Sequence, residues 1–157
     1  MRLVTSLVIG VAAAPSGHAG AQGMETCVNG AMEAFEVRLS AALNAQAAPN
    51  FDLVRGREVG DCGGIALLQC GAEEACRSEA ADEMRAQAAR FAAVPVPADV
   101  SGRFPPWSDG LYPQLWTRVT EGCDGCAPDA MLEHLGDAAS LWQVARVVGV
   151  VEAGAWR

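Results

Sequence analysis

Three of the six cysteines fall within one short stretch, Cys62 to Cys76, and this clustering constrains the fold more than any other feature of the chain. Cys27 lies well before the stretch, and Cys123 and Cys126 lie well after it. If the cysteines are oxidised, the stretch ties the two halves of the chain together. The function of the chain therefore depends first on whether its cysteines form structural disulfides, bind a metal or act as catalysts.

The first 21 residues have the pattern of a secretory signal peptide. Arg2 supplies a positive start, and residues 3–14 form an apolar run that is too short to cross a bilayer as a helix. The run ends at Pro15, and Ala19-Gly20-Ala21 gives the small-x-small pattern of a cleavage site. We expect cleavage after Ala21, with an N-terminal core helix as the alternative. The predicted location is periplasmic or secreted, with no membrane association after cleavage.

All six cysteines follow the expected cleavage site, and an even number in an exported chain indicates disulfide bonds. We expect Cys27 to pair with one cysteine of the central stretch and Cys123 to pair locally with Cys126. The remaining two of the central three would then pair together. Cys70 with Cys76 is the least favoured of these pairs, because six residues of continuous helix separate two positions by about 9 Å. The disulfide candidates are Cys27, Cys62, Cys70, Cys76, Cys123 and Cys126.

The chain is strongly acidic. Its formal charge is −8, and the loss of Arg2 with the leader makes it −9. This charge argues against electrostatic binding to nucleic acid or to an anionic membrane, and it would attract a basic partner. The alternative is that the charge serves solubility alone.

Apolar residues recur at helical spacing in four segments. We expect long helices over residues 25–45, 72–93 and 128–148, a short helix over 111–122 with Pro113 in its first turn, and one or two helical turns over 65–70. The predicted buried stripes are Val28, Met32, Phe35, Leu39 and Leu43; Cys76, Ala80, Met84, Ala88 and Phe91; Leu115, Trp116 and Val119; and Met131, Leu135, Ala138, Trp142, Ala145 and Val148.

Glycine and proline mark the connections between these segments. We expect a loop over residues 44–61 and a proline-rich crossover over 94–110, anchored by Phe104 and Trp107. The fold class is therefore all-α, a small disulfide-stapled helical bundle or hairpin with three long helices and one short one. Residues 22–157 are expected to form a single domain, since neither side of the crossover is large enough to bury its own core.

The pair Cys123-Asp-Gly-Cys126 could also carry chemistry. A C-x-x-C pair at the start of a helix can lower a thiol pKa and catalyse disulfide exchange. Such oxidoreductases place the pair after a strand, and the sequence predicts no strand there. Ala127 follows the pair, so this is not the Cys-x-x-Cys-His sequence that attaches haem. A structural disulfide is the preferred interpretation, and thiol–disulfide exchange is the alternative.

The other candidates for catalysis or metal binding are weaker. His134 is the one histidine that follows the expected cleavage site, so no site with several histidines can form. Cys123, Cys126 and His134 could supply three metal ligands, but their spacing matches no zinc pattern. Neighbouring carboxylates such as Asp82 and Glu83 point to different sides of a helix. We therefore predict no catalytic residue, no metal and no cofactor.

Part of the chain resembles the lysozyme-inhibitor LprI-like family of small exported cysteine-rich helical proteins. The resemblance lies in residues 62–70, in residues 76–84 with Ala81-Asp82-Glu83-Met84, and in Trp116 to Arg118 followed by Cys123. Arg85 stands where that family has an asparagine. The resemblance implies a disulfide-tied helical fold and, for some members, inhibition of basic lysozymes. It identifies no inhibitory residue in this chain.

Taken together, the sequence predicts an exported, non-enzymatic, disulfide-stabilised helical protein. Its expected partner is a basic protein such as lysozyme, bound through an acidic surface. The alternative function is a thiol–disulfide oxidoreductase that uses Cys123 and Cys126.

Overall fold

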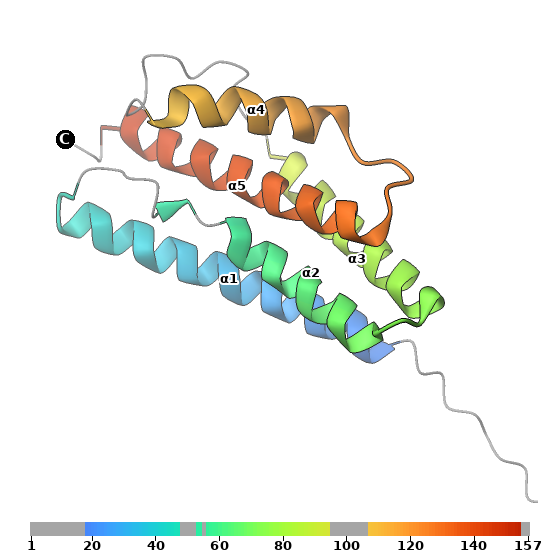
Figure 1. The fold of residues 1–157 in the computed structure, drawn as a ribbon. Coiled ribbons are helices and arrows are strands. Elements are labelled where there is room, and N and C mark those ends of the chain that lie inside the picture. The colour runs from blue at the N-terminus through green and yellow to red at the C-terminus, as the bar shows by residue number, and fades with distance from the viewer. Residues whose placement is uncertain (1–17, 48–52, 55, 95–106, 155–157) are drawn as a thin grey trace, which may run out of the picture.

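The computed structural model describes residues 18–47, 53–54, 56–94 and 107–154, and these residues form an all-α bundle of five helices with no strand among them (Figure 1). The predicted fold class is confirmed, although the helices are more numerous than expected. Their bounds are His18–Asn44 for α1, Gly56–Cys70 for α2, Glu74–Ala92 for α3, Trp107–Glu121 for α4 and Pro128–Glu152 for α5.

Helix α5 lies at the centre of the bundle and contacts α2, α3 and α4 (Figure 1). Helix α1 packs against α2 and α3. Because α5 is apolar and is surrounded by other helices, it buries side chains on most of its faces. Leu135, Ala139 and Val147 are inaccessible to solvent.

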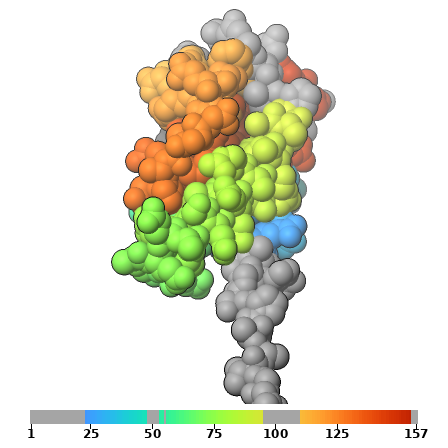
Figure 2. Space-filling view, turned by 90° about the vertical axis from the view of Figure 1, so that its right-hand side faces the viewer, coloured from blue at the N-terminus to red at the C-terminus, as the bar shows by residue number. Residues whose placement is uncertain are grey.

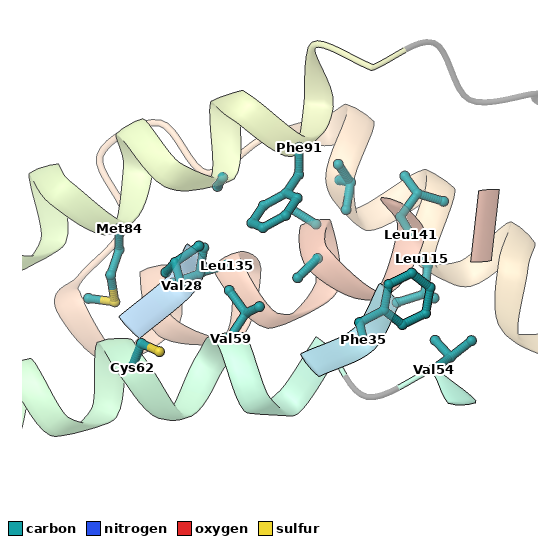
Figure 3. Packing of buried hydrophobic residues seen from close by; sticks show 14 of the residues in the cluster. Val28, Phe35, Val54, Val59, Cys62, Met84, Phe91, Leu115, Leu135 and Leu141 are labelled. Atoms are coloured by element: carbon teal, nitrogen blue, oxygen red, sulfur yellow. The ribbon is translucent and has the colours of Figure 1, made fainter. Parts of the chain in front are cut away.

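The buried core follows the apolar stripes that the sequence predicts (Figure 3). Val28, Phe35, Met84 and Leu135 are fully buried, and each comes from a predicted stripe. Alanines at positions such as 80 and 88 of α3 keep the neighbouring helices close together.

Aromatic rings fill one part of this core. Trp142 of α5 packs between Phe35 of α1 and Phe91 of α3, with ring centroids 5.6 and 5.9 Å away respectively. Tyr112 of α4 is fully buried, and burial raises the pKa of its hydroxyl to about 12. These contacts tie helices from both halves of the chain into one core.

The loop expected over residues 44–61 is wrong for its second half, because α2 begins at Gly56. The glycines that suggest a turn in the sequence instead allow two helices to touch. A Cβ atom at Gly56 would lie 2.5 Å from the carbonyl oxygen of Gly136 and 2.5 Å from the backbone nitrogen of Ser140. Glycine at this position therefore permits the close approach of α2 to α5.

The boundaries of other helices also differ from the prediction, and among these the largest shift at a helix start is in α1, which begins at His18 rather than at residue 25. Helix α4 begins at Trp107 rather than Leu111, so Pro113 lies inside the helix and not in its first turn. Helix α5 continues through Gly149 to Glu152. Glycine and proline lower helix propensity, but packing of the apolar face can outweigh that cost. The predicted crossover over 94–110, including Phe104, falls mostly outside the described residues, as do residues 1–17 of the predicted leader.

The six cysteines form three disulfides: Cys27–Cys62, Cys70–Cys76 and Cys123–Cys126. Their Cα atoms are 5.8, 5.4 and 5.3 Å apart, which suits the covalent geometry of the bond. Cys27 pairs within the central stretch and Cys123 pairs locally, as expected.

The low rank given to the pair Cys70–Cys76 is wrong. That ranking assumed a continuous helix, whereas α2 ends at Cys70 and α3 begins at Glu74. Gly71 between them has a φ of +58°, a conformation that glycine adopts without strain. The resulting turn brings the two cysteines within bonding distance.

Candidate functional site

One end of the bundle brings together two turns that are far apart in the sequence. The turn between α2 and α3 and the turn between α4 and α5 lie next to each other on the face shown in Figure 2, in green and orange. Gly71, Arg77, Cys126 and Pro128 line one hollow at this junction. The Arg77 guanidinium also pairs with the Asp129 carboxylate across the junction, with Nη2 and Oδ1 3.0 Å apart.

A disulfide closes each of these two turns. Cys70–Cys76 spans the turn from α2 to α3, and Cys123–Cys126 spans the turn from α4 to α5. Gly122 and Gly125 both have positive φ, which lets the second turn reverse tightly. The two disulfides therefore restrict the backbone of both turns.

Carboxylates are concentrated on these turns. We define the acidic end as the two turns with their exposed acidic residues, which are Glu73, Glu74, Glu121, Asp124 and Asp129. Only Asp129 of the five has an ion-pair partner among the described residues, namely Arg77. The other four carboxylates form no ion pair with the described residues, although Arg77 and Arg85 line the same hollow as Glu74.

Helix stability explains some of these charges but not all of them. Glu74 and Asp129 occupy the first turns of α3 and α5, where a negative charge is favourable to the helix dipole. Glu121 is the last residue of α4, where the dipole disfavours a negative charge. Folding alone therefore gives no reason for the carboxylate at Glu121.

The acidic surface continues along α3. Burial, together with the nearby Glu79 carboxylate, raises the pKa of Glu83 above its ordinary value. This agrees with the repulsion expected between these two positions, one helical turn apart. Asp82 in contrast pairs with Arg85, so its charge is neutralised locally.

The Cys123–Cys126 pair lies in this acidic end as a disulfide, with both residues partly buried. Helix α4 precedes it, and no strand of the described residues leads into it. The strand that precedes redox-active C-x-x-C pairs is thus missing from the part of the chain that the structure describes.

The residues considered for a metal site do not come together as one. No group of three histidine, cysteine or acidic side chains among the described residues is arranged to hold a metal ion. His134 lies in α5, where burial lowers the pKa of its imidazole despite the opposing effect of Asp137. The sulfurs of Cys123 and Cys126 are bonded to each other rather than available as thiolates.

The sequence predicts an acidic surface but does not locate it. Arg77 and Asp129 are 52 residues apart in the chain, and no spacing rule joins them. The signal that could have located the site is shared by the two turns: each has a pair of nearby cysteines, a glycine and adjacent carboxylates.

Comparison with protein-family models, with curated proteins and with solved structures gave no match to this chain. None of the helices in the described part of the chain is both long enough and apolar enough to cross a membrane. The fold and the site together define a disulfide-stabilised all-α protein with an acidic end, in which a disulfide closes each of two turns.

Proposed function

We propose that this chain is an exported, non-enzymatic protein that binds a basic protein, such as a lysozyme, through its acidic end. The observation that carries the proposal is a set of four exposed carboxylates that form no ion pair with the described residues and lie at two disulfide-closed turns: Glu73, Glu74, Glu121 and Asp124. The exported location is supported by the leader pattern of residues 1–21 and by the three disulfides. The lysozyme candidate is supported by the resemblance to the LprI-like family.

Two physical effects favour binding of a basic partner at this end. The net negative charge of the chain steers a basic protein toward it and raises the association rate. The disulfides hold the turns in one conformation, so little conformational entropy is lost when a partner docks. A complex of this kind weakens as salt is added, because exposed charges are screened.

The proposal is tested by measuring binding to, and inhibition of, a basic lysozyme at low and at moderate salt. We expect the double variant Glu74→Gln/Asp124→Asn, one change in each turn, to bind about tenfold more weakly, a loss of about 1.4 kcal/mol. The matched control is Glu25→Gln/Glu33→Gln, which removes the same charge from exposed positions of α1. We expect the control to bind within about twofold of the wild type, since it changes only the long-range field.

Equal weakening by both variants would contradict a site at the acidic end and would leave only the net charge as the cause. Absence of binding and of inhibition at both salt concentrations would remove lysozyme as the partner.

A further inference from the structure

A second surface feature begins beside the acidic end and has no part in the site described above. It is a groove of about 780 Å³ in which α5 forms the floor and α2 forms one wall, with Arg118 of α4 on the opposite side. The floor and the α2 wall are lined in part by Gly60, Gly64 and Gly136. Leu68, two residues before Cys70, also lines the groove, so the groove opens next to the stapled turn between α2 and α3.

Glycine makes this groove deep enough to receive side chains. A Cβ atom at Gly60 would lie 3.7 Å from the Cα atom of Gly136, so α2 and α5 are nearly in backbone contact below the groove. A Cβ atom at Gly64 would in contrast meet nothing within 4 Å. The space above Gly64 is therefore open, and a large side chain from a partner can enter it.

The α2 wall of the groove exposes apolar side chains. Ile65 is 52% exposed and Leu68 is 82% exposed, and they are two of the four large hydrophobic residues that stand exposed in the described part of the chain. Leu132 of α5 continues this apolar strip on the floor, partly buried. Apolar surface gathered in a groove is typical of an interaction site, whereas single exposed apolar residues are ordinary.

Charges in the groove favour a cationic occupant. Three carboxylates line it, from Asp61, Glu133 and Asp137, against two guanidinium groups, from Arg57 and Arg118. Arg118 is already engaged, because its Nη2 atom lies 2.9 Å from Oδ1 of Asp137. Asp61 and Glu133 form no ion pair among the described residues, although the Glu133 carboxylate also raises the pKa of the Arg118 guanidinium. Arg57 has no ion-pair partner there either, so the lining of the groove carries a net charge of −1.

We propose that this groove binds an amphipathic, positively charged α-helix of the partner protein. Apolar residues at i, i+3, i+4 and i+7 of that helix would pack on Ile65, Leu68 and Leu132, which is the helix-in-groove mode of recognition. Its basic residues would face Asp61 and Glu133 and reach the acidic end. The inference rests on the proposed function, because it names the element of a basic partner that this surface recognises.

The test uses two synthetic 18-residue peptides of leucine and lysine with identical composition. One has leucines at helical spacing, and the other has them scrambled, so that the two carry the same charge. We expect the helical peptide to bind the full disulfide-bonded protein at least about tenfold more tightly than the scrambled one, measured by fluorescence anisotropy. Apolar contacts in the groove are available only to a peptide whose leucines share one face.

Three variants locate the site of that preference. Gly64→Trp fills the groove without a clash at its Cβ atom, and Leu68→Ser removes apolar surface without changing charge. We expect each to abolish the preference for the helical peptide. The control Val37→Ser, at a position of α1 that is 69% exposed and outside the groove, is expected to leave it unchanged. Circular dichroism and thermal melts confirm that each variant is folded.

The outcomes separate this inference from the proposed function. Equal binding of both peptides, lost in Glu74→Gln/Asp124→Asn, would overturn the groove inference and leave the acidic end standing. A preference for the helical peptide that survives Gly64→Trp would also overturn it. Self-association of the wild type that Gly64→Trp abolishes would assign the groove to a second copy of this chain and would overturn the proposed occupant.

Discussion

Gly56→Ala is expected to destabilise the protein by about 3 kcal/mol, the upper part of the usual range for overpacking a core. The added methyl group would lie 2.5 Å from two backbone atoms of α5, the carbonyl oxygen of Gly136 and the nitrogen of Ser140. Backbone atoms cannot rotate away as a side chain can, so α2 must move away from α5. The free energy of unfolding, measured by urea titration, shows the effect directly.

A matched glycine provides the control for this substitution. Gly30 lies inside α1, is exposed, and would place a Cβ atom with nothing within 4 Å. Gly30→Ala is expected to stabilise the protein by up to about 1 kcal/mol, because alanine loses less backbone entropy in a helix than glycine does. A stabilising effect of Gly56→Ala similar to that of Gly30→Ala would contradict the close contact between α2 and α5.

The second large effect is expected from the disulfide that joins α1 to α2. Removal of this disulfide in Cys27→Ala/Cys62→Ala is expected to lower the free energy of unfolding by about 4 kcal/mol. The two cysteines are 35 residues apart, so the bond restricts a long loop of the unfolded chain. The Arg38–Glu58 ion pair connects the same two helices, but it is partly exposed and contributes little. Denaturant titration of the oxidised protein measures the loss.

The pair Cys123→Ala/Cys126→Ala is the comparison for that variant. These residues are three apart in the chain, so the loop-entropy argument gives a smaller loss of about 2 kcal/mol. An equal or greater loss than that of Cys27→Ala/Cys62→Ala would show that loop length does not determine the stability that the disulfides contribute here.

The long helices could be predicted because their apolar residues repeat at the helical period. Val28, Phe35 and Leu39 mark one face of α1, and Met84, Ala88 and Phe91 mark one face of α3. These residues are buried in the structure as the spacing predicts. This repeat can be read from a short stretch of sequence, because a helix that packs on one side has its apolar residues on that side.

Helix α2 could not be predicted in the same way, because its packing depends on small residues. Gly56, Gly60 and Gly63 all lie against α5 or its neighbours, and each weakens the local preference for a helix. Their spacing of three to four residues was the available signal, since it places them on one face of a helix. Contact with α5 is a tertiary effect, and it outweighs the propensity of the glycines.

The candidate site was predictable only in part. The composition indicates an acidic surface, and the six cysteines indicate disulfide bonds. The meeting of the two stapled turns depends on how α3 and α5 pack, which no local pattern in either turn specifies. The groove beside α2 was not predicted, because the glycines of residues 56–61 indicate a loop in the sequence rather than the first turns of a helix.

The most direct test of the disulfide-closed acidic end is disulfide mapping by mass spectrometry, on protein recovered from a bacterial periplasm, where thiols are oxidised. We predict no free thiol and three bonds, Cys27–Cys62, Cys70–Cys76 and Cys123–Cys126. Free thiols at Cys123 and Cys126, or a different partner for Cys70, would contradict the two closed turns on which the acidic end is built.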